Sequence, residues 1–197
     1  MPRDEDLAAL NALAALGIHD ADAMPFDVPW TDAPVGELGR NSLQFHWGLR
    51  AAWKPESWQL PLMVKGGEVI VGVQGIFATN FAVTRQVGTG SWIGKAYQGR
   101  GIGREMRAAI LHLAFAGLGA KRATSGAFEN NAASIAVSRA LGYRENGDDI
   151  KAPRGEPMRQ IRFLLPREVW ERNRRQDIEI QGLEPCLPMF GLDQPNA

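Results

Sequence analysis

The sequence predicts a single domain of the α/β (α+β) class, with helices around a central mixed, mostly antiparallel sheet. Three observations support this fold. Apolar residues recur at helical spacing, then alternate on both sides of a Gly-Gly pair, and finally switch between strand and helix patterns after a glycine-rich junction. A length of 197 residues favours one domain, and 45% hydrophobic residues suffice for a packed core.

The first quarter of the chain is predicted to form two helices joined by a loop. Leucine recurs at every third position over residues 5–16, which predicts a helix. The Pro- and Asp-rich stretch 20–34 is expected to be a long loop. Its Phe26 and Trp30 either anchor the loop to the core or form a wall beside a substrate. A second helix is predicted over residues 36–53.

Strands and helices then follow along the chain. Residues 58–64 and 68–77 flank a Lys65-Gly66-Gly67 turn, which predicts a β-hairpin. The further elements are expected to be a strand over 88–94, a helix over 103–116, a strand over 120–128, a helix over 132–141, a strand over 161–165 and a helix over 166–174.

A tail follows the predicted domain. We place the domain at residues 1–175 and the tail at 176–197, with a short strand expected at 178–181. The apolar side chains of this tail need a covering surface, either on the same domain or on a neighbouring subunit. The chain is therefore expected to form a homo-oligomer.

Charge and cysteine content exclude several classes of function. The chain has 22 basic and 22 acidic residues, so no overall field attracts nucleic acid or an anionic membrane. Cys186 is the only cysteine, and no Cys or His spacing is typical of a metal site. No apolar run reaches the length of a membrane span, and the charged start, Arg3 to Asp6, is unlike a signal peptide. These features predict a soluble cytoplasmic protein without a metal.

The sharpest local feature is the segment Tyr97-Gln98-Gly99-Arg100-Gly101-Ile102-Gly103-Arg104. Its three alternating glycines lie between a predicted strand and a predicted helix. Glycine permits a tight turn with outward N–H groups, and the helix start adds the positive end of its dipole. Lys95, Arg100, Arg104 and Arg107 against Glu105 add three positive charges over residues 95–107. The segment therefore reads as a cradle for a pyrophosphate or, alternatively, as a plain tight turn.

Two common phosphate-binding motifs do not fit this segment. A P-loop requires Lys-Ser or Lys-Thr after its last glycine, and neither is present. A dinucleotide fold requires G-x-G-x-x-G/A, but Arg104 and Met106 occupy the sixth position of the two possible registers. Nucleotide hydrolysis and NAD binding are therefore disfavoured.

The paired motifs resemble those of the GCN5-related N-acetyltransferase (GNAT) superfamily. Gln98-Gly99-Arg100-Gly101-Ile102-Gly103 matches the Q/R-x-x-G-x-G/A signature. About 30 residues later, Asn131-Ala132-Ala133-Ser134 and Leu141-Gly142-Tyr143 resemble its second signature. Serine at positions 134 and 138 resembles the RimJ/RimL branch, which acetylates ribosomal-protein N-termini. The resemblance covers roughly residues 5–172, and members usually have a strand before the first helix, for which Met1 to Asp4 leaves little room.

The resemblance implies a coenzyme A (CoA) site. The backbone of Trp92, Ile93 and Gly94 would pair with the pantetheine arm, and Asn131 and Ser134 would contact the pantetheine and adenosine side. The strands at 88–94 and 120–128 would splay apart to admit the thioester. The pyrophosphate would lie on Gln98, Gly99, Arg100, Gly101, Ile102, Gly103 and Arg104.

The resemblance also implies an activity. The chain is expected to transfer an acetyl or succinyl group from acetyl-CoA or succinyl-CoA to a primary amine, on a small molecule or on a protein N-terminus or lysine. Succinyl requires a cation near the acyl end, for which Arg85 and Lys95 are candidates. A non-catalytic CoA-binding module and another phosphate-ligand protein remain alternatives.

One position departs from the family pattern. Many members carry, where this chain has Ser138, a tyrosine that protonates the departing thiolate. Ser138 follows Ser134 by four residues and shares its helix face. Its hydroxyl is predicted to hydrogen-bond the thiolate or relay a proton, or else it only makes room for CoA. Tyr143 is the fallback acid, although its place in the motif favours a packing role.

The sequence favours direct attack by the amine on the thioester. Cys186 is remote from both motifs, which disfavours an acyl-cysteine intermediate. A base must then take the proton of the amine. The candidates are His46, Glu129, Asp27, Glu68 and His112.

Overall fold

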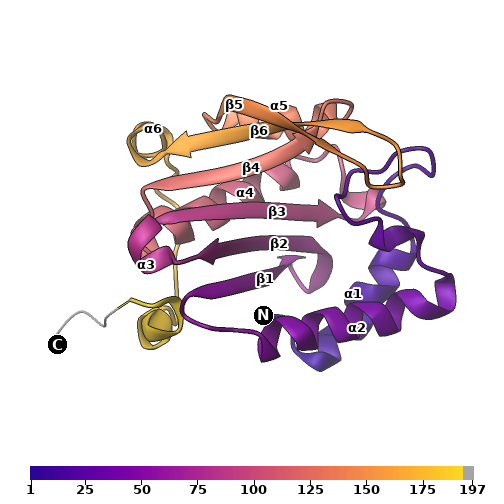
Figure 1. Ribbon diagram of the computed structural model, residues 1–197. Coiled ribbons are helices and arrows are strands. Elements are labelled where there is room, and N and C mark those ends of the chain that lie inside the picture. Colours follow the sequence, from indigo (N-terminus) through magenta and orange to yellow (C-terminus); the bar gives the residue numbers. More distant parts are fainter. Residues whose placement is uncertain (193–197) are drawn as a thin grey trace.

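The computed structural model describes residues 1–192 as a six-stranded open sheet with helices around it (Figure 1). The strand order is β1-β2-β3-β4-β6-β5. The strands are β1 (Ser57–Gly66), β2 (Val69–Thr79), β3 (Gln86–Ile93), β4 (Arg122–Phe128), β5 (Arg144–Lys151) and β6 (Met158–Pro166). The mixed α/β class is confirmed, since four antiparallel pairings and one parallel pairing join the six strands into one sheet.

The parallel pair in the middle of the sheet is short. β3 pairs with β4 only from Gln86–Arg122 to Gly88–Thr124, whereas β2 follows β3 as far as Ile93. Beyond Gly88 the two strands diverge, while β4 remains paired with β6 along its whole length. The sheet therefore opens into a V between β3 and β4, as the sequence analysis expected.

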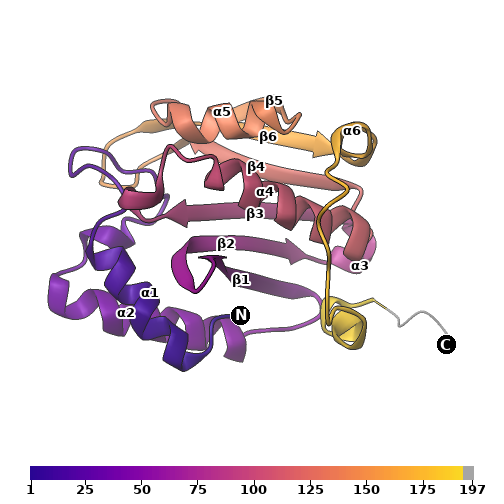
Figure 2. The same cartoon turned by 180° about the vertical axis from the view of Figure 1, so that it is seen from behind.

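Helices cover the sheet and flank one of its ends. They are α1 (Asp4–Ala15), α2 (Val35–Ala51), α3 (Phe81–Thr84), α4 (Ile102–His112), α5 (Ala132–Ala140) and α6 (Arg167–Asn173). Viewed from behind, α4 and α5 lie across one face of the sheet (Figure 2). A π-helical turn over Leu113–Gly117 extends α4. Within the described part of the chain, no helix is long and apolar enough to cross a membrane.

The main core lies between the sheet and the α4 side of the molecule. Its largest fully buried side chains include Trp58, Phe81, Phe115, Phe128 and Phe163. A smaller apolar cluster joins Leu7 and Leu10 of α1 to Val73 of β2. This second cluster fixes α1, and with it the loop that follows, against the end of β3.

The C-terminal tail packs on its own domain. Leu183, Leu187 and Phe190 contact the main core, and Trp53 Nε1 donates to the carbonyl oxygen of Met189 at 2.8 Å. The strand expected at 178–181 is absent, because this stretch crosses the α4 side as an irregular strap without a partner strand. The tail residues 193–197 lie outside the described residues. Since Leu183, Leu187 and Phe190 pack on the same domain, these side chains no longer argue for a homo-oligomer, which stays an untested prediction.

One strand had no counterpart in the sequence analysis. β5 is an edge strand whose side chains are mostly exposed, and its sequence, Arg-Glu-Asn-Gly-Asp-Asp-Ile-Lys, is almost entirely polar. A strand that pairs on one edge and buries little on either face has no alternating apolar signal. The β5–β6 hairpin is therefore a product of pairing with β6 rather than of local pattern.

Candidate active site

A continuous cleft of about 1740 Å³ runs through the V between β3 and β4. One end is bordered by the glycine-rich loop and the first turns of α4 and α5. The other end is bordered by the α1–α2 loop (residues 16–34), by α2, and by the β5–β6 hairpin. The two ends hold different kinds of groups.

The glycine-rich loop has the geometry of an anion cradle. Gly99 and Gly101 have φ angles of 72° and 82°, and an added Cβ would meet no atom within 4 Å at either position. Gly101 caps α4, whose first backbone bonds run from Arg104 and Glu105 to the Gly101 carbonyl. The N–H groups of Ile102 and Gly103 precede these bonds and remain available for an anion. The open backbone thus fits a pyrophosphate.

The side chains of this loop fasten the cradle rather than fill it. Gln98 Nε2 donates to the carbonyl oxygens of Ile18 at 2.6 Å and of Ile93 at 2.9 Å. The Arg100 guanidinium lies over the Tyr97 ring at 5.8 Å. Gln98 therefore ties together the end of β3, the cradle and the start of the α1–α2 loop, while Gly99, Gly101, Gly103 and Arg104 line the cleft.

The end of β3 offers a free strand edge. Trp92 and Ile93 pair with β2 on one side and line the cleft, while β4 has already diverged on the other side. Gly94 donates to the Val71 carbonyl, and the side chain of Leu13 lies where a Cβ on Gly94 would be. An extended ligand could add to this edge as a strand does.

The first turn of α5 faces the cradle across the cleft. The Asn131 side chain caps this helix by accepting from the Ser134 N–H at 3.0 Å, and both residues line the cleft. Ser138 lies one turn further, fully buried, and is not among the residues that line the cleft. Its Oγ has no hydrogen-bond partner in the described part of the chain. The geometry thus leaves its predicted role in the reaction untested.

Tyr143 lies behind Thr89, on the side of Thr89 away from the cleft. Its side chain is buried, and its hydroxyl shares a hydrogen bond of 3.4 Å with Thr89 Oγ1, which lines the cleft. Burial raises the pKa of the Tyr143 phenol, although the nearby Arg107 charge opposes this effect. Tyr143 is therefore a neutral donor that reaches the cleft through Thr89.

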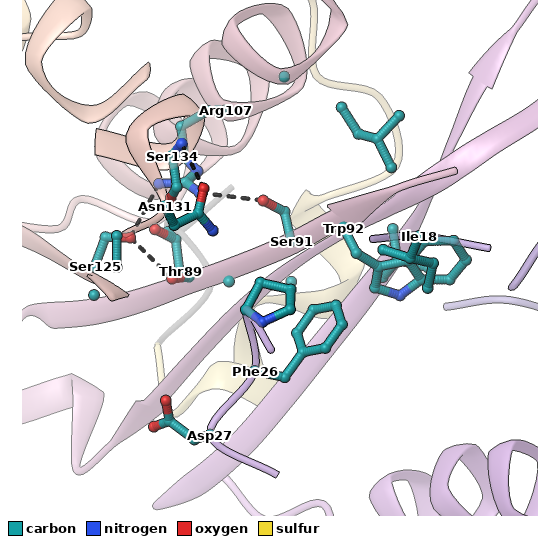
Figure 3. A pocket seen from close by; sticks show the side chains of 18 of the residues that line it. Ile18, Phe26, Asp27, Thr89, Ser91, Trp92, Arg107, Ser125, Asn131 and Ser134 are labelled. Carbon is teal, nitrogen blue, oxygen red and sulfur yellow. Dashed lines mark hydrogen bonds between the residues drawn. The ribbon is translucent and has the colours of Figure 1, made fainter. Parts of the chain in front are cut away.

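Arg107 occupies a place that the sequence analysis did not anticipate. It was counted there with the cations of the cradle, but the structure turns it to the buried side of α4, into the V. Its guanidinium donates to Ser125 Oγ at 3.0 Å and to Ser91 Oγ at 3.1 Å, which joins β4 to β3 across the opening (Figure 3). Arg107 is buried because its position on α4 falls on the face that packs on the sheet. Summing charges along the sequence does not take this face into account.

Arg85 and Lys95, the cations predicted near an acyl group, do not line the cleft. Arg85 closes α3 with a φ of 48° and donates to the Leu118 carbonyl, and the exposed Lys95 pairs with Asp20. The structure therefore brings neither of these two candidates to the cleft.

The other end of the cleft is walled by aromatic side chains. Phe26 and Trp30 of the α1–α2 loop are 5.3 Å apart between ring centroids, and Trp30 is 5.8 Å from Trp92. His19 meets Phe26 edge-on at 5.8 Å. Phe26 lies near Trp92, and the Asp27 side chain points away from both (Figure 3). Of the two readings of Phe26 and Trp30, the structure favours a wall.

Polar contacts tie the α1–α2 loop to the distant β5–β6 hairpin, beside which it runs (Figure 1). Arg154 donates to both carboxylate oxygens of Asp32, at 2.7 and 2.6 Å, and to the Ala21 carbonyl at 3.0 Å. These bonds hold the pKa of Asp32 below its usual value. Gln160 donates to the Asp27 carboxylate. Residues about 120 to 130 positions apart thus build one wall.

The structure separates the five candidate bases. Asp27 and His46 line the cleft. Glu129 pairs with Arg159 at 3.6 Å, His112 packs on Trp170, and Glu68 lies at the β1–β2 turn, so these three are outside it. Burial lowers the pKa of His46, with further lowering by the Arg50 charge and the chain's ammonium group. No cluster of three metal-ligating side chains occurs among residues 1–192.

Comparison with solved structures identifies the fold. RimJ from Mycobacterium smegmatis, solved with CoA-disulfide, has a TM-score of 0.69 at 20% identity over 84% of this chain and 79% of that chain. The acetyltransferase yncA from Salmonella typhimurium, solved with acetyl-CoA, has a TM-score of 0.62 at 16% identity over 84% and 90%. A ribosomal-protein-alanine N-acetyltransferase from Brucella melitensis has a TM-score of 0.60 at 19% identity over 83% and 96%.

The profile of the acetyltransferase (GNAT) domain matches residues 1–144. This match covers the cradle, the free edge of β3 and all of α5, and it includes both motifs of the sequence analysis. The chain belongs to the GNAT acetyltransferase family.

Proposed function

We propose that the protein transfers an acyl group from acetyl-CoA or succinyl-CoA to a primary amine, by direct attack within a ternary complex. The observation that carries this proposal is the opening of β3 from β4 beside a glycine cradle, within one cleft. Backbone donors at the cradle and the free strand edge suit the pyrophosphate and the pantetheine amides. Trp92, Ile93, Gly94 and the segment Gln98–Arg104 form this donor site, with Asn131 and Ser134 on its far wall.

The acceptor enters from the aromatic end. Phe26, Trp30, Trp92 and Asp27 line the cleft there, so this end offers aromatic rings and a carboxylate. Ring faces and carboxylates attract an ammonium group, which is the resting form of most primary amines at neutral pH. The fold likeness to the Brucella melitensis enzyme supports a protein N-terminus as one acceptor class.

The transfer needs no intermediate on the protein. The amine nitrogen bonds to the thioester carbonyl carbon, the C–S bond breaks, the amine loses a proton and the CoA sulfur gains one. Asp27 and His46 are the two candidates for accepting the amine proton, and the lowered pKa keeps His46 neutral near pH 7. Cys186 does not line the cleft, which supports direct attack.

Ser138 remains our candidate for stabilising the departing thiolate. A buried hydroxyl without a partner costs free energy, so a native fold usually provides one. Ser138 lies on the same helix face as Ser134, which lines the cleft. The thiolate sulfur that develops as the C–S bond breaks would supply the missing partner.

The experiment begins with the donor. Native mass spectrometry of the purified protein identifies any acyl-CoA it retains. Turnover is then followed as free CoA and product mass with acetyl-CoA or succinyl-CoA against polyamines, amino acids, aminoglycosides and peptides with free N-termini. Chromatographic detection of CoA avoids the Cys186 thiol. Intersecting initial-rate patterns are expected, whereas parallel patterns or an acylated Cys186 would overturn direct attack.

A non-catalytic CoA-binding module is the second candidate, because the cradle would be the same in both cases. It predicts CoA binding without amide formation for any amine in the panel. A protein that binds neither CoA nor acetyl-CoA would contradict both candidates.

A further inference from the structure

Arg107 is a buried cation without an anion. Its exposed fraction is 4%, and none of the ion pairs within residues 1–192 includes it. The guanidinium bonds to two neutral hydroxyls, those of Ser91 and Ser125, and Nε has no partner in this part of the chain. A charge removed from water and compensated only by neutral groups is costly. Because Arg107 lines the cleft, it is a candidate for binding an anionic group of a ligand.

The position of Arg107 shows which end of a donor would reach it. Ser125 follows the last β3–β4 pair by one residue on β4, and Ser91 follows it by three on β3. The guanidinium between them therefore lies within the opening of the V (Figure 3). A thioester held along the free edge of β3 would place its acyl group in this opening.

The pyrophosphate is not the anion in question. Its cradle surrounds Gly101 at the start of α4, and Arg107 lies six residues further, or about 9 Å along a helix axis. A carboxylate is planar, and its two oxygens fit the forked donors of a guanidinium. Thr89 and Tyr143 add hydroxyls on the same side of the opening.

We propose that Arg107 binds the free carboxylate of a short dicarboxylic acyl group, so that the preferred donor is of the succinyl-CoA type rather than acetyl-CoA. This inference rests on the proposed function and assigns its donor. The amine still attacks the thioester carbon, and the carboxylate that binds Arg107 takes no part in bond making. Ser91 and Ser125 are positioning residues that hold the guanidinium in the V.

Binding without any acceptor tests the proposal. Calorimetry is performed with CoA, acetyl-CoA, malonyl-CoA, succinyl-CoA and glutaryl-CoA on the wild type and on Arg107→Met, which keeps similar length without charge. One dicarboxylic donor is expected to bind about 10- to 100-fold more tightly than acetyl-CoA, as for a charge-assisted hydrogen bond. Arg107→Met should abolish this difference and leave the affinity for CoA unchanged.

Conservative variants separate recognition from folding. Arg107→Lys keeps a point charge but not the fork, so it should retain only part of the preference. Ser91→Ala combined with Ser125→Ala should also reduce it without reducing CoA affinity. If Arg107→Met does not fold, these two variants carry the test. A preference that survives in all of them would overturn the assignment.

The remaining outcomes are distinct. Equal affinities for acetyl-CoA and every dicarboxylic donor, with CoA binding intact, would refute the role of Arg107 but not the acyltransferase. Failure to bind CoA would refute the proposed function itself. The turnover assay with the acceptor panel is repeated on Arg107→Met. If this variant changes only the KM of carboxylate-bearing acceptors, the carboxylate belongs to the acceptor and the donor assignment is wrong.

Discussion

The two ends of the cleft are built in different ways. The donor end comes from one continuous stretch, Trp92 to Ser134, and relies on backbone groups: a strand edge, two glycines with positive φ and two helix starts. The acceptor end relies on side chains from the α1–α2 loop, α2 and the β5–β6 hairpin. Backbone cradles follow from local sequence, whereas a wall of distant side chains exists only after the chain has folded.

This difference should appear in dynamics as well. The α1–α2 loop is fastened to the hairpin by Arg154 and Gln160, and the side chains of the Arg154–Asp32 pair are 34% and 41% exposed. Exposed ion pairs contribute little stability, although a two-pronged guanidinium contact contributes more than most. We therefore expect the acceptor end to open locally at a lower free energy than the donor end.

The largest effect is expected from a change to the cradle. Gly101→Asp places a carboxylate and a side chain where the backbone is open and φ is positive. Acetyl-CoA affinity, measured by calorimetry, should fall by about 100-fold, because charge repulsion and lost backbone contacts together amount to about 2.7 kcal/mol. Gly67→Asp, also at positive φ with open space but outside the cleft, carries the same strain and charge. If Gly101→Asp and Gly67→Asp bind acetyl-CoA equally well, the glycine-rich loop is not the pyrophosphate site.

A substitution at Ser138 shows whether a side chain contributes to catalysis at the donor end, where the other contacts come from the backbone. Ser138→Ala should lower kcat and kcat/KM together by roughly 10- to 100-fold, because a bond to a developing thiolate exists mainly in the transition state. Acetyl-CoA affinity should stay the same. The melting temperature should not fall, since the hydroxyl has no partner within residues 1–192. Turnover at the wild-type rate would mean that the serine only makes room.

Removing the contacts of Arg154 with the α1–α2 loop should loosen the acceptor end and leave the donor end unchanged. Arg154→Ala removes three hydrogen bonds to the α1–α2 loop. Hydrogen exchange over residues 20–34 should accelerate about tenfold, as for the loss of about 1.4 kcal/mol of local stability, while acetyl-CoA affinity stays constant. Arg159→Ala is the matched control, because its pairs with Asp148 and Glu129 do not involve this loop. Equal exchange in the two variants would show that the aromatic wall holds the loop by itself.

The smallest effect concerns pH. Burial lowers the pKa of His46 in the folded state below its ordinary value of 6.5, so the unfolded chain binds this proton more readily. The stability contributed by neutral His46 is fully present above pH 6.5 and is lost as the pH falls through the folded pKa. Chemical denaturation from pH 7.5 to 5 should show this decline, with a shallower slope for His46→Gln. If His46→Gln has the same dependence of stability on pH as the wild type, another group causes the decline.

The sequence by itself determined the elements that local pattern encodes. The β1–β2 hairpin, α4, β4, α5 and the tight glycine turn before α4 are confirmed near their predicted places, because periodicity, Gly-Gly and the Gly-x-Gly-x-Gly segment act over a few residues. Binding of a pyrophosphate at that turn stays a prediction. The V was also expected, through the family resemblance of the paired motifs. The polar edge strand β5 was missed and a strand at 178–181 was wrongly expected, since pairing partners rather than local residues decide both.

Only the tertiary structure decided which side chains meet in the cleft. It joined Arg154 to Asp32 and Gln160 to Asp27, kept Asp27 and His46 among five candidate bases, and removed Arg85 and Lys95 from the acyl end. It also turned Arg107 from a presumed phosphate cation into the buried group between Ser91 and Ser125. The physical reason is that helix phase and sheet opening set where a charge points, and both depend on contacts between segments far apart in the chain.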